Sequence, residues 1–415
     1  MNAAPKTLLT AAWVAPMDGP ILRDAGVVHE AGRVVAVGAA RALAKSHPDA
    51  TVEDLGEVVL LPGLVNAHCH LELTTIDRPP EGLTFVSWVM KLLKTLRREA
   101  SLEADLYEIA NGFSQCLGFG VSSVGDISAS VRFVRDAIFR LQGARVVSYG
   151  EVRAMASRRI RLEEHLAAAI EPTRVPSNWP RVGISPHAPY SVEPEGYRRC
   201  LAAAIRNQLP ITTHLAETRD EREFLASHTG PLRELWDFIG GWTDDVPTFA
   251  GGPIRYAKHL GLLDYERASL AHVNYCDDDE LAILAGGRAS VAYCPRTHRY
   301  FGHPPHRWRE MLARGINVAV GTDSCASSPD LNLVDDLRLL HEIAPEVDVE
   351  TLWSMATRRA ARAIGIDDVA GTITPGKASD FVAFKAAGAD PLTSILEDRL
   401  ARPMRVWVGT QRVDC

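Results

Sequence analysis

The chain has 415 residues, of which 46% are hydrophobic and 23% charged, and its formal net charge is -7. These proportions are those of an ordinary folded protein and exclude a disordered, collagen-like or coiled-coil chain. The acidic balance argues against a nucleic-acid polymer as partner, because phosphate groups attract basic surfaces. No apolar run reaches the roughly 20 residues that span a bilayer. Seven scattered cysteines without a CxxC pair lead us to expect a cytoplasmic protein with reduced thiols and no membrane segment.

Both ends of the chain consist of short strand-like segments separated by glycine, aspartate and proline. The strands expected at the N-terminal end are Thr7–Val14, Gly26–His29, Arg33–Gly38 and Glu57–Leu61. Those expected at the C-terminal end are Ile373–Pro375, Asp380–Phe384 and Met404–Val408. The pattern predicts one small β-sandwich domain that is built from residues 1–60 and 369–415.

The middle of the chain alternates short apolar runs with helical stretches, which is typical of a parallel sheet with crossover helices. The expected strands are Gly63–His68, Ser122–Ile127, Arg145–Gly150, Arg181–Ser185, Ile211–His214, Ser269–His272, Ser290–Cys294 and Asn317–Gly321. Helices are expected over Leu102–Cys116, Glu195–Arg206, Asp220–Ser227, Asp278–Ala285 and Asp330–Glu342. Eight such units predict an α/β fold, a (β/α)8 TIM-type barrel over residues 61–368. Residues 229–257, rich in glycine, proline and aromatic residues, are expected to form an inserted loop or lid.

Polar residues stand where several of these strands end. They are His68 and His70 on the first strand, His187 after the fourth, His214 and Glu217 at the fifth, His272 at the sixth, and Asp323 and Ser324 after the eighth. In a barrel of this kind all these positions lie at one rim, where active sites are found.

Four of these residues are predicted to bind one divalent metal ion. His68 and His70 are two positions apart on a strand, so their side chains point the same way. With His214 and Asp323 they offer nitrogen and oxygen ligands and leave a position open for water, as in catalytic zinc sites. We expect zinc, with iron or manganese as alternatives, because this ligand set accepts all three. Such a metal lowers the pKa of a bound water toward about 7.

The motifs resemble those of the amidohydrolase superfamily. The matching text is Leu61-Pro-Gly-Leu-Val-Asn-Ala-His-Cys-His70, His214-Leu-Ala-Glu217, Ala271-His272 and Gly321-Thr-Asp-Ser324, followed by Gly371 to Asp380 near the C-terminus. The resemblance covers nearly the whole chain and is strongest to the metal-dependent nucleoside and nucleobase deaminase branch. That branch includes triazine chlorohydrolase-like, S-adenosylhomocysteine and aminofutalosine deaminases.

The resemblance implies a mononuclear site, because the fourth strand carries neither the lysine nor the carboxylate that bridges two metals. It also implies hydrolytic deamination, in which a metal-activated water attacks an amidine carbon and ammonia leaves. Glu217 would carry a proton from the water to a ring nitrogen. Asp323 would bind the metal and accept the proton of the water, and His272 would orient that water without being a ligand.

The expected substrate is a 5′-substituted adenosine, aminofutalosine first, which implies a role in menaquinone biosynthesis. The segment Ser185–Tyr190 resembles that of such deaminases, and there His187 would touch the substrate. Further substrate contacts are expected from Glu72, Trp88, His298 and Ser324, and Glu72 could instead buttress the loop after the first strand. His298 stands where methylthioadenosine deaminases and triazine hydrolases more often have asparagine. Arg97, Arg98 or Arg153 could pair with a substrate carboxylate.

Several alternatives stay open at this point. The chain could be an S-adenosylhomocysteine or methylthioadenosine deaminase, a guanine or triazine aminohydrolase, or an enzyme that hydrolyses another ring, as imidazolonepropionases do. A metal-free scaffold is the alternative outside enzymes, although all four expected ligands are present. A homodimer is common in the resembled family, and no interface can be read from the sequence.

Overall fold

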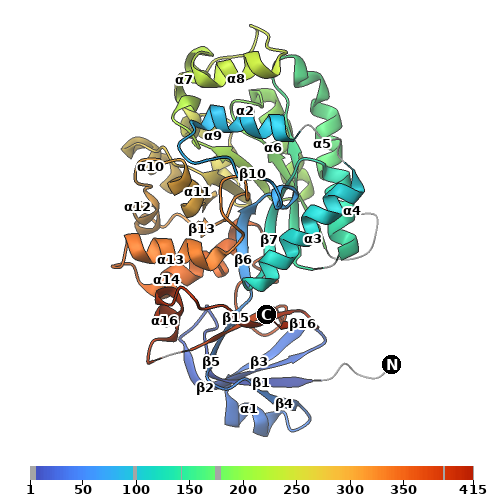
Figure 1. Cartoon of the computed structure of the whole chain (residues 1–415), viewed down its shortest axis with the longest axis vertical. Helices are drawn as coiled ribbons and strands as arrows, with labels where there is room; N and C mark the ends of the chain where they lie inside the picture. Colours follow the sequence, from blue (N-terminus) through green and yellow to red (C-terminus); the bar gives the residue numbers. More distant parts are fainter. Residues whose placement is uncertain (1–5, 97–100, 142, 173–178, 387, 415) are drawn as a thin grey trace.

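The computed structural model describes residues 6–96, 101–141, 143–172, 179–386 and 388–414. The chain forms a barrel with surrounding helices and a smaller β-sheet part that contains the first and the last described strands (Figure 1). In the described ranges no helix combines the length and the apolar character needed to cross a bilayer. The predicted fold class, a TIM-type barrel with a small β domain from both termini, is confirmed.

Eight parallel strands form the barrel, in the order β13-β12-β11-β10-β9-β8-β7-β6. They are β6 (Leu64–Cys69), β7 (Val121–Ser128), β8 (Arg145–Val152), β9 (Arg181–Pro186), β10 (Ile211–Leu215), β11 (Ala268–His272), β12 (Ser290–Tyr293) and β13 (Val318–Val320). The last strand returns to the first, since the Asp323 amide donates to the His68 carbonyl at 3.0 Å. Closure brings the ends of β6 and β13 together at the rim.

The strand side chains alternate between two apolar clusters. Val65 of β6 and Val147 of β8 pack in a cluster with alanines of α15 (Arg358–Ala363). Their neighbours Leu64 and Val146 belong instead to the large core cluster that includes residues of the surrounding helices. Burial on both faces explains why these strands read as continuous apolar runs rather than as alternating ones.

Helices of the barrel part follow the strands in the expected manner. They are α2 (Phe85–Thr95), α3 (Leu102–Gly118), α4 (Val131–Leu141), α5 (Leu162–Ile170), α6 (Pro194–Asn207), α7 (Asp220–Ser227), α8 (Pro231–Ile239), α9 (Pro253–His259), α10 (Asp278–Ala285), α11 (Pro295–Tyr300), α12 (Trp308–Ala313), α13 (Leu333–Ile343) and α14 (Val349–Met355). Three short 3₁₀ helices accompany them in the described ranges: η1 (Leu71–Leu73), η2 (Ala156–Arg161) and η3 (Leu262–Asp264).

The smaller part is one sheet in the order β16-β15-β14-β5-β1-β2-β3, with β4 paired to β1. Its strands are β1 (Thr7–Val14), β2 (Leu22–Glu30), β3 (Arg33–Ala39), β4 (Thr51–Asp54), β5 (Val58–Pro62), β14 (Phe381–Lys385), β15 (Pro403–Val408) and β16 (Gln411–Asp414). Two helices, α1 (Ala40–Ser46) and α16 (Pro391–Glu397), were not expected. The sheet fits the predicted sandwich domain, while the domain boundaries at residues 60 and 369 stay a prediction.

Gly63 marks the passage from β5 of the sheet to β6 of the barrel. Its amide donates to the Asp380 carbonyl at 2.8 Å. A Cβ atom at this position would lie 2.2 Å from the Ser122 hydroxyl oxygen. The two parts therefore meet so closely here that only glycine fits.

Three expectations differ from the structure. Residues 373–375 are not a strand, because Pro375 has no N–H to donate and Gly376 has a φ of +91°. The helix expected from Asp330 begins at Leu333, since the Asp330 carboxylate accepts the Asn332 amide instead. Residues 229–257 contain α8 and the start of α9, because each glycine–proline pair begins a helix there.

Candidate active site at the barrel rim

The predicted metal ligands converge at the rim. His70 Nε2 lies 3.4 Å from His214 Nε2 and 3.5 Å from the Asp323 Oδ1 oxygen. His68 Nε2 lies 3.9 Å from the same oxygen. In a tetrahedral site with bonds of about 2.0–2.1 Å, ligand atoms lie about 3.3–3.4 Å apart. The distances of 3.4–3.9 Å are at or slightly above this spacing, so the three histidines, with Asp323 beside them, fit one metal ion.

The ring nitrogens of these histidines are available for a metal. The His68 side chain is buried, and neither of its ring nitrogens has a hydrogen-bond partner in the described part of the chain. Burial and the neighbouring histidines hold the pKa of His68 well below its usual value. The His214 Nδ1 atom lies 2.9 Å from the His187 carbonyl oxygen, to which it donates. This bond directs Nε2 toward His70, and neutral imidazoles of this kind are what a metal requires.

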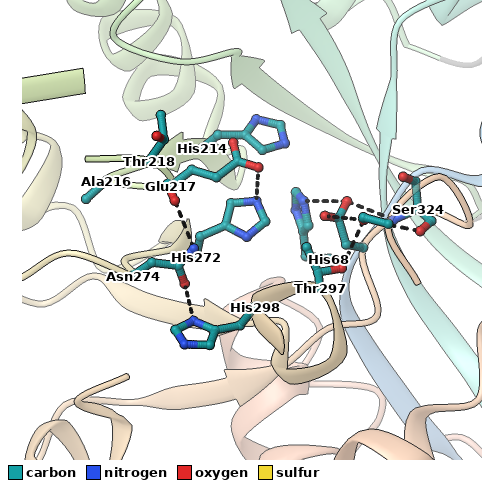
Figure 2. Close-up of polar contacts among 12 residues, drawn as sticks. His68, His214, Ala216, Glu217, Thr218, His272, Asn274, Thr297, His298 and Ser324 are labelled. Carbon is teal, nitrogen blue, oxygen red and sulfur yellow. Dashed lines mark hydrogen bonds and ion pairs between the residues drawn. The ribbon is translucent and has the colours of Figure 1, made fainter. Parts of the chain in front are cut away.

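Glu217 and His272 form a second group beside the predicted ligands, and after the role predicted for them we call them the catalytic pair. The Glu217 Oε1 atom lies 3.6 Å from His272 Nε2, and both side chains are buried (Figure 2). Burial, together with the charge of Asp323, raises the pKa of Glu217 well above its usual value. A carboxyl group that binds a proton readily, next to a metal site, is suited to move protons during hydrolysis.

Glu221 fixes the loop that carries Glu217. Its two carboxylate oxygens accept the amides of Ala216 at 3.0 Å and Glu217 at 2.6 Å. Ala216 has a φ of 50°, a conformation that side chains other than glycine rarely adopt. Glu221 thus holds a strained turn in which Glu217 faces the site.

His187 lies at the other side of the ligands. Its Nδ1 atom is 2.6 Å from the Ser191 hydroxyl, and its Nε2 atom is 3.6 Å from the Glu151 carboxylate. Glu151 also binds Arg153 at 2.6 Å. These contacts fix the orientation of His187 at the wall of the cavity.

A cavity of about 600 Å³ opens over this site. Its deep end contains His70, His214, Glu217 and Asp323, with Ser324, His187, Glu151 and Arg153 beside them. Its outer end is apolar and lies between α2 and α8, with side chains such as Leu92, Leu96, Leu235, Phe238 and Ile239. The volume is within the range of small-molecule sites.

The other predicted substrate contacts fall at different places. Trp88 lines the cavity and donates from Nε1 to the Ala326 carbonyl at 3.0 Å. Glu72 also lines it, but its oxygens accept the amides of Ala129 and Ser130 at 3.0 and 3.3 Å. This geometry favours the buttress role over a ribose contact.

One of the named residues does not line the cavity, and another cannot be placed because it lies outside the described residues. His298 is buried behind the catalytic pair, where its Nδ1 atom lies 3.0 Å from the Asn274 side-chain oxygen. Arg97, like Arg98, lies outside the described residues.

Sequence reasoning missed several residues of the site. Glu151 is the next residue after the predicted third strand, so extending that strand by one position would have found it. Arg158 lines the cavity from the 3₁₀ helix η2, for which the sequence has no strong signal. The Asn274 and His306 side chains hydrogen-bond to the backbone carbonyls of Glu217 and His272, respectively. No spacing rule in a sequence predicts such contacts.

Comparison with known proteins gives a family model and several relatives. The model described as "Amidohydrolase family" matches residues 59–410. A 5-methylthioadenosine/S-adenosylhomocysteine deaminase of Moorella thermoacetica is 28% identical over 388 residues, or 91% of this chain and 85% of the relative. A 5′-deoxyadenosine deaminase of Methanothermobacter thermautotrophicus is 28% identical over 423 residues, or 92% and 91%.

Two solved structures share the fold. Helicobacter pylori aminofutalosine deaminase in complex with methylthio-coformycin has a TM-score of 0.84 at 21% identity, covering 98% of this chain and 100% of that chain. An adenosine deaminase from Xanthomonas campestris with bound zinc has a TM-score of 0.78 at 21% identity, covering 98% and 92%. At this identity the likeness establishes the fold and not the activity.

Proposed function

Because this chain belongs to the amidohydrolase family, we propose that it is a metal-dependent hydrolase that deaminates adenosine-type nucleosides. One observation carries the proposal. Glu217 lies 3.6 Å from His272 and shares a cavity with the converging side chains of His70, His214 and Asp323. The relatives are named as deaminases of adenosine derivatives, and these names support the same reaction.

His68, His70, His214 and Asp323 are the proposed ligands of one divalent metal ion. The unpartnered nitrogens of His68 and the close spacing of the ligand atoms fit such an ion. When bound, the metal would lower the pKa of a water molecule and so supply the nucleophile. Zinc is the proposed metal, and the zinc in the Xanthomonas campestris structure favours it over iron or manganese.

The catalytic pair would move the protons. In this proposal His272 orients the attacking water, and Glu217 carries a proton from it to the ring nitrogen beside the amino group. Asp323 would accept the remaining proton and return it to the amino group, which then leaves as ammonia. His187, fixed by Ser191, would contact the heterocycle from the opposite side of the cavity.

The finer proposal concerns the 5′ end of the nucleoside. The outer, apolar end of the cavity between α2 and α8 exceeds what a free base needs, which favours a 5′-substituted adenosine over guanine or a triazine. Arg158 lines this region, and its Nη2 atom donates to the Ile239 carbonyl at 3.3 Å. Within the described part of the chain, the Arg158 guanidinium forms no ion pair with a carboxylate. A cation on an apolar wall suits a substituent that ends in a carboxylate, as in aminofutalosine.

A second candidate is a 5′-deoxyadenosine, methylthioadenosine or S-adenosylhomocysteine deaminase. It is favoured by the relatives, which are 28% identical over nine-tenths of this chain. The two candidates share the reaction and differ only in what occupies the outer end of the cavity.

A nucleoside panel tests the proposal. Purified, zinc-loaded protein is assayed for ammonia release and loss of adenine absorbance with aminofutalosine, S-adenosylhomocysteine, methylthioadenosine, 5′-deoxyadenosine and adenosine. We expect turnover of at least one, with the highest kcat/KM for aminofutalosine. If all five stay intact, the proposed reaction is wrong. If methylthioadenosine is preferred, the second candidate replaces the first.

Metal analysis separates an enzyme from a metal-free scaffold. We expect about one equivalent of metal per chain after gel filtration and its loss in a His68→Ala, His70→Ala variant. Below about 0.1 equivalent without rescue on reconstitution, the scaffold alternative would be favoured.

A further inference from the structure

The backbone of the catalytic pair is strained where His272 leaves strand β11. His272 has a φ of 73° and the next residue, Val273, a φ of 54°. Left-handed conformations of this kind are unfavourable outside glycine and persist only where other contacts hold them. The β-branched Val273 is an especially poor fit to such a conformation. Something must therefore fix this turn.

One such contact comes from His306. Its Nε2 atom lies 2.9 Å from the His272 carbonyl oxygen, to which it donates. The His306 ring stacks on Tyr293 of β12 with centroids 3.9 Å apart, and it is buried. A stacked, buried imidazole has little freedom, so it holds the carbonyl in one direction.

A second contact chain reaches the other member of the pair. The Asn274 Nδ2 atom donates to the Glu217 carbonyl at 3.0 Å, and its side-chain oxygen lies 3.0 Å from His298 Nδ1 (Figure 2). Because an amide has one donor end and one acceptor end, the first bond makes His298 the donor in the second. His298 thereby fixes Asn274, and Asn274 fixes the loop that carries Glu217.

Both histidines come from one anchored stretch, residues 294–306, which we call the histidine segment. Arg296 ties its helix α11 to the core. The Arg296 amide and Nε atom donate to the Asp336 carboxylate at 3.0 and 2.9 Å, and Nη1 binds Asp330 at 2.7 Å. The segment is therefore a rigid support rather than a loose loop.

We propose that His298, acting through Asn274, and His306, acting directly, are positioning residues that hold Glu217 and His272 at their working distance. The inference rests on the proposed function, since it assigns the pair a proton-handling role. Neither histidine would touch the substrate. The His298 imidazole bridges to Asn274 at 3.0 Å.

Substitutions in the zinc-loaded full chain test the proposal. Replacing either residue by leucine, His298→Leu or His306→Leu, removes the bond. We expect kcat to fall about 10- to 100-fold with KM changed less than about threefold, because a small displacement of reacting groups is costly. His298→Asn keeps a donor at the Nδ1 position and His306→Gln keeps one at the Nε2 position. Both should regain kcat to within about threefold of the wild type.

His303→Leu is the matched control. His303 belongs to the same segment, but its Nδ1 atom lies 2.9 Å from the Tyr275 hydroxyl and not from the pair. This variant should keep kcat within about threefold of the wild type. The proposal is overturned if the leucine variants at 298 and 306 match His303→Leu in kcat, or if asparagine and glutamine rescue nothing.

A double variant separates positioning from general damage. If Asn274 acts through Glu217, Asn274→Leu should lower the kcat of the wild type but add little to a Glu217→Gln background. Fully additive losses would contradict the proposal.

Amide hydrogen exchange tests the positioning role without measuring enzymatic turnover. If the wild type deaminates no nucleoside, the proposed function fails, while exchange of peptides 211–219 and 268–276 still reports on the support. Faster exchange in His298→Leu and His306→Leu than in His303→Leu supports the positioning role. Equal exchange in all three variants overturns it.

Discussion

Two buried carboxylates in the site, those of Glu217 and Asp323, differ in their surroundings. The Asp323 oxygens accept the Ser324 amide at 2.7 Å and the Ser327 hydroxyl at 3.1 Å. Such donors favour the ionised form, which a metal ligand requires. Glu217 has its His272 neighbour at 3.6 Å, and burial raises its pKa well above the usual value. Burial raises the pKa of Asp323 as well, but the charge of His214 and these donors oppose that rise, whereas burial and the carboxylates of Asp323 and Glu221 all raise the pKa of Glu217. Asp323 therefore ionises more readily than Glu217, which suits the two groups to different tasks.

Glu217→Gln should keep the metal and lose the reaction. The amide is isosteric and leaves the proposed ligands untouched, but it cannot carry a proton. We expect kcat to fall by about 10²- to 10⁴-fold, with one metal equivalent retained, measured by steady-state ammonia release and metal analysis.

Glu223→Gln serves as the control for this change. Glu223 lies on α7, which follows the loop of Glu217, and its side chain is exposed. The kcat of the Glu223→Gln variant should therefore equal that of the wild type. Near wild-type turnover by Glu217→Gln would remove the proton-shuttle role from this residue.

At the scale of elements, the histidine segment makes stability depend on pH. Burial lowers the pKa of His298 and His303 to about 4 and that of His306 to about 3. In the unfolded chain these side chains titrate near about 6.5. Between that value and the folded pKa the unfolded state binds more protons, so stability is lost as the pH falls.

His306→Gln should reduce this dependence, because glutamine keeps the donor without titrating. On lowering the pH from 7 to 5 the wild type should lose about 2 kcal/mol more of its unfolding free energy than the variant does. Urea unfolding of both proteins at the two pH values measures the difference. An equal loss in both would show that His306 does not titrate as its burial requires.

Residues of η2 and α8 line the outer end of the cavity, so these two elements should determine which 5′ substituent binds. Arg158→Met should raise the KM for a nucleoside that ends in a carboxylate, such as aminofutalosine, about tenfold or more. The KM for 5′-deoxyadenosine should stay unchanged. The methionine keeps the apolar contact with Trp236, whose ring centroid lies 5.4 Å from the guanidinium carbon.

Arg140→Met, an exposed arginine change on α4, is the control for Arg158→Met and should alter neither KM. Equal KM changes for both substrates would instead mean that Arg158 supports the wall rather than binds an anion.

The sequence predicted the barrel well because its strands are short apolar runs between clear breakers. Strand β10 was expected over Ile211–His214 and is found over Ile211–Leu215. It also predicted that His68, His214 and Asp323 meet, since parallel strands end at one rim. It could not predict α8, whose glycine–proline start resembles a loop, nor contacts such as His306 to the His272 carbonyl. Those depend on how distant segments pack, which no local pattern encodes.

At the scale of the molecule, the site depends on a barrel that is joined to the terminal sheet by a shared apolar core and by polar contacts. Arg145 opens barrel strand β8, and its Nε and Nη2 atoms bind the Asp380 carboxylate at 2.5 and 2.9 Å. Asp380 lies just before β14 of the sheet and also accepts the Gly409 amide at 2.7 Å. Only 16% of the Arg145 side chain and 3% of the Asp380 side chain are exposed. This buried ion pair with two hydrogen bonds therefore couples the barrel to the terminal sheet.

Arg145→Met should destabilise the whole chain, because it leaves the Asp380 carboxylate buried without its cation. Removing one partner of a buried ion pair costs about 3–5 kcal/mol of unfolding free energy, and the remaining hydrogen bond from Gly409 should hold the loss near the lower end of that range.

Arg309→Met is the control. The partner of Arg309 is Glu346, both side chains are half exposed, and such pairs contribute about 1 kcal/mol or less. Urea unfolding followed by tryptophan fluorescence measures both variants. If the pair couples the parts, Arg145→Met should also broaden or split the transition, because the sheet can then unfold before the barrel. A single transition with a loss no larger than that of Arg309→Met would show that the two parts are held together by their apolar contacts alone.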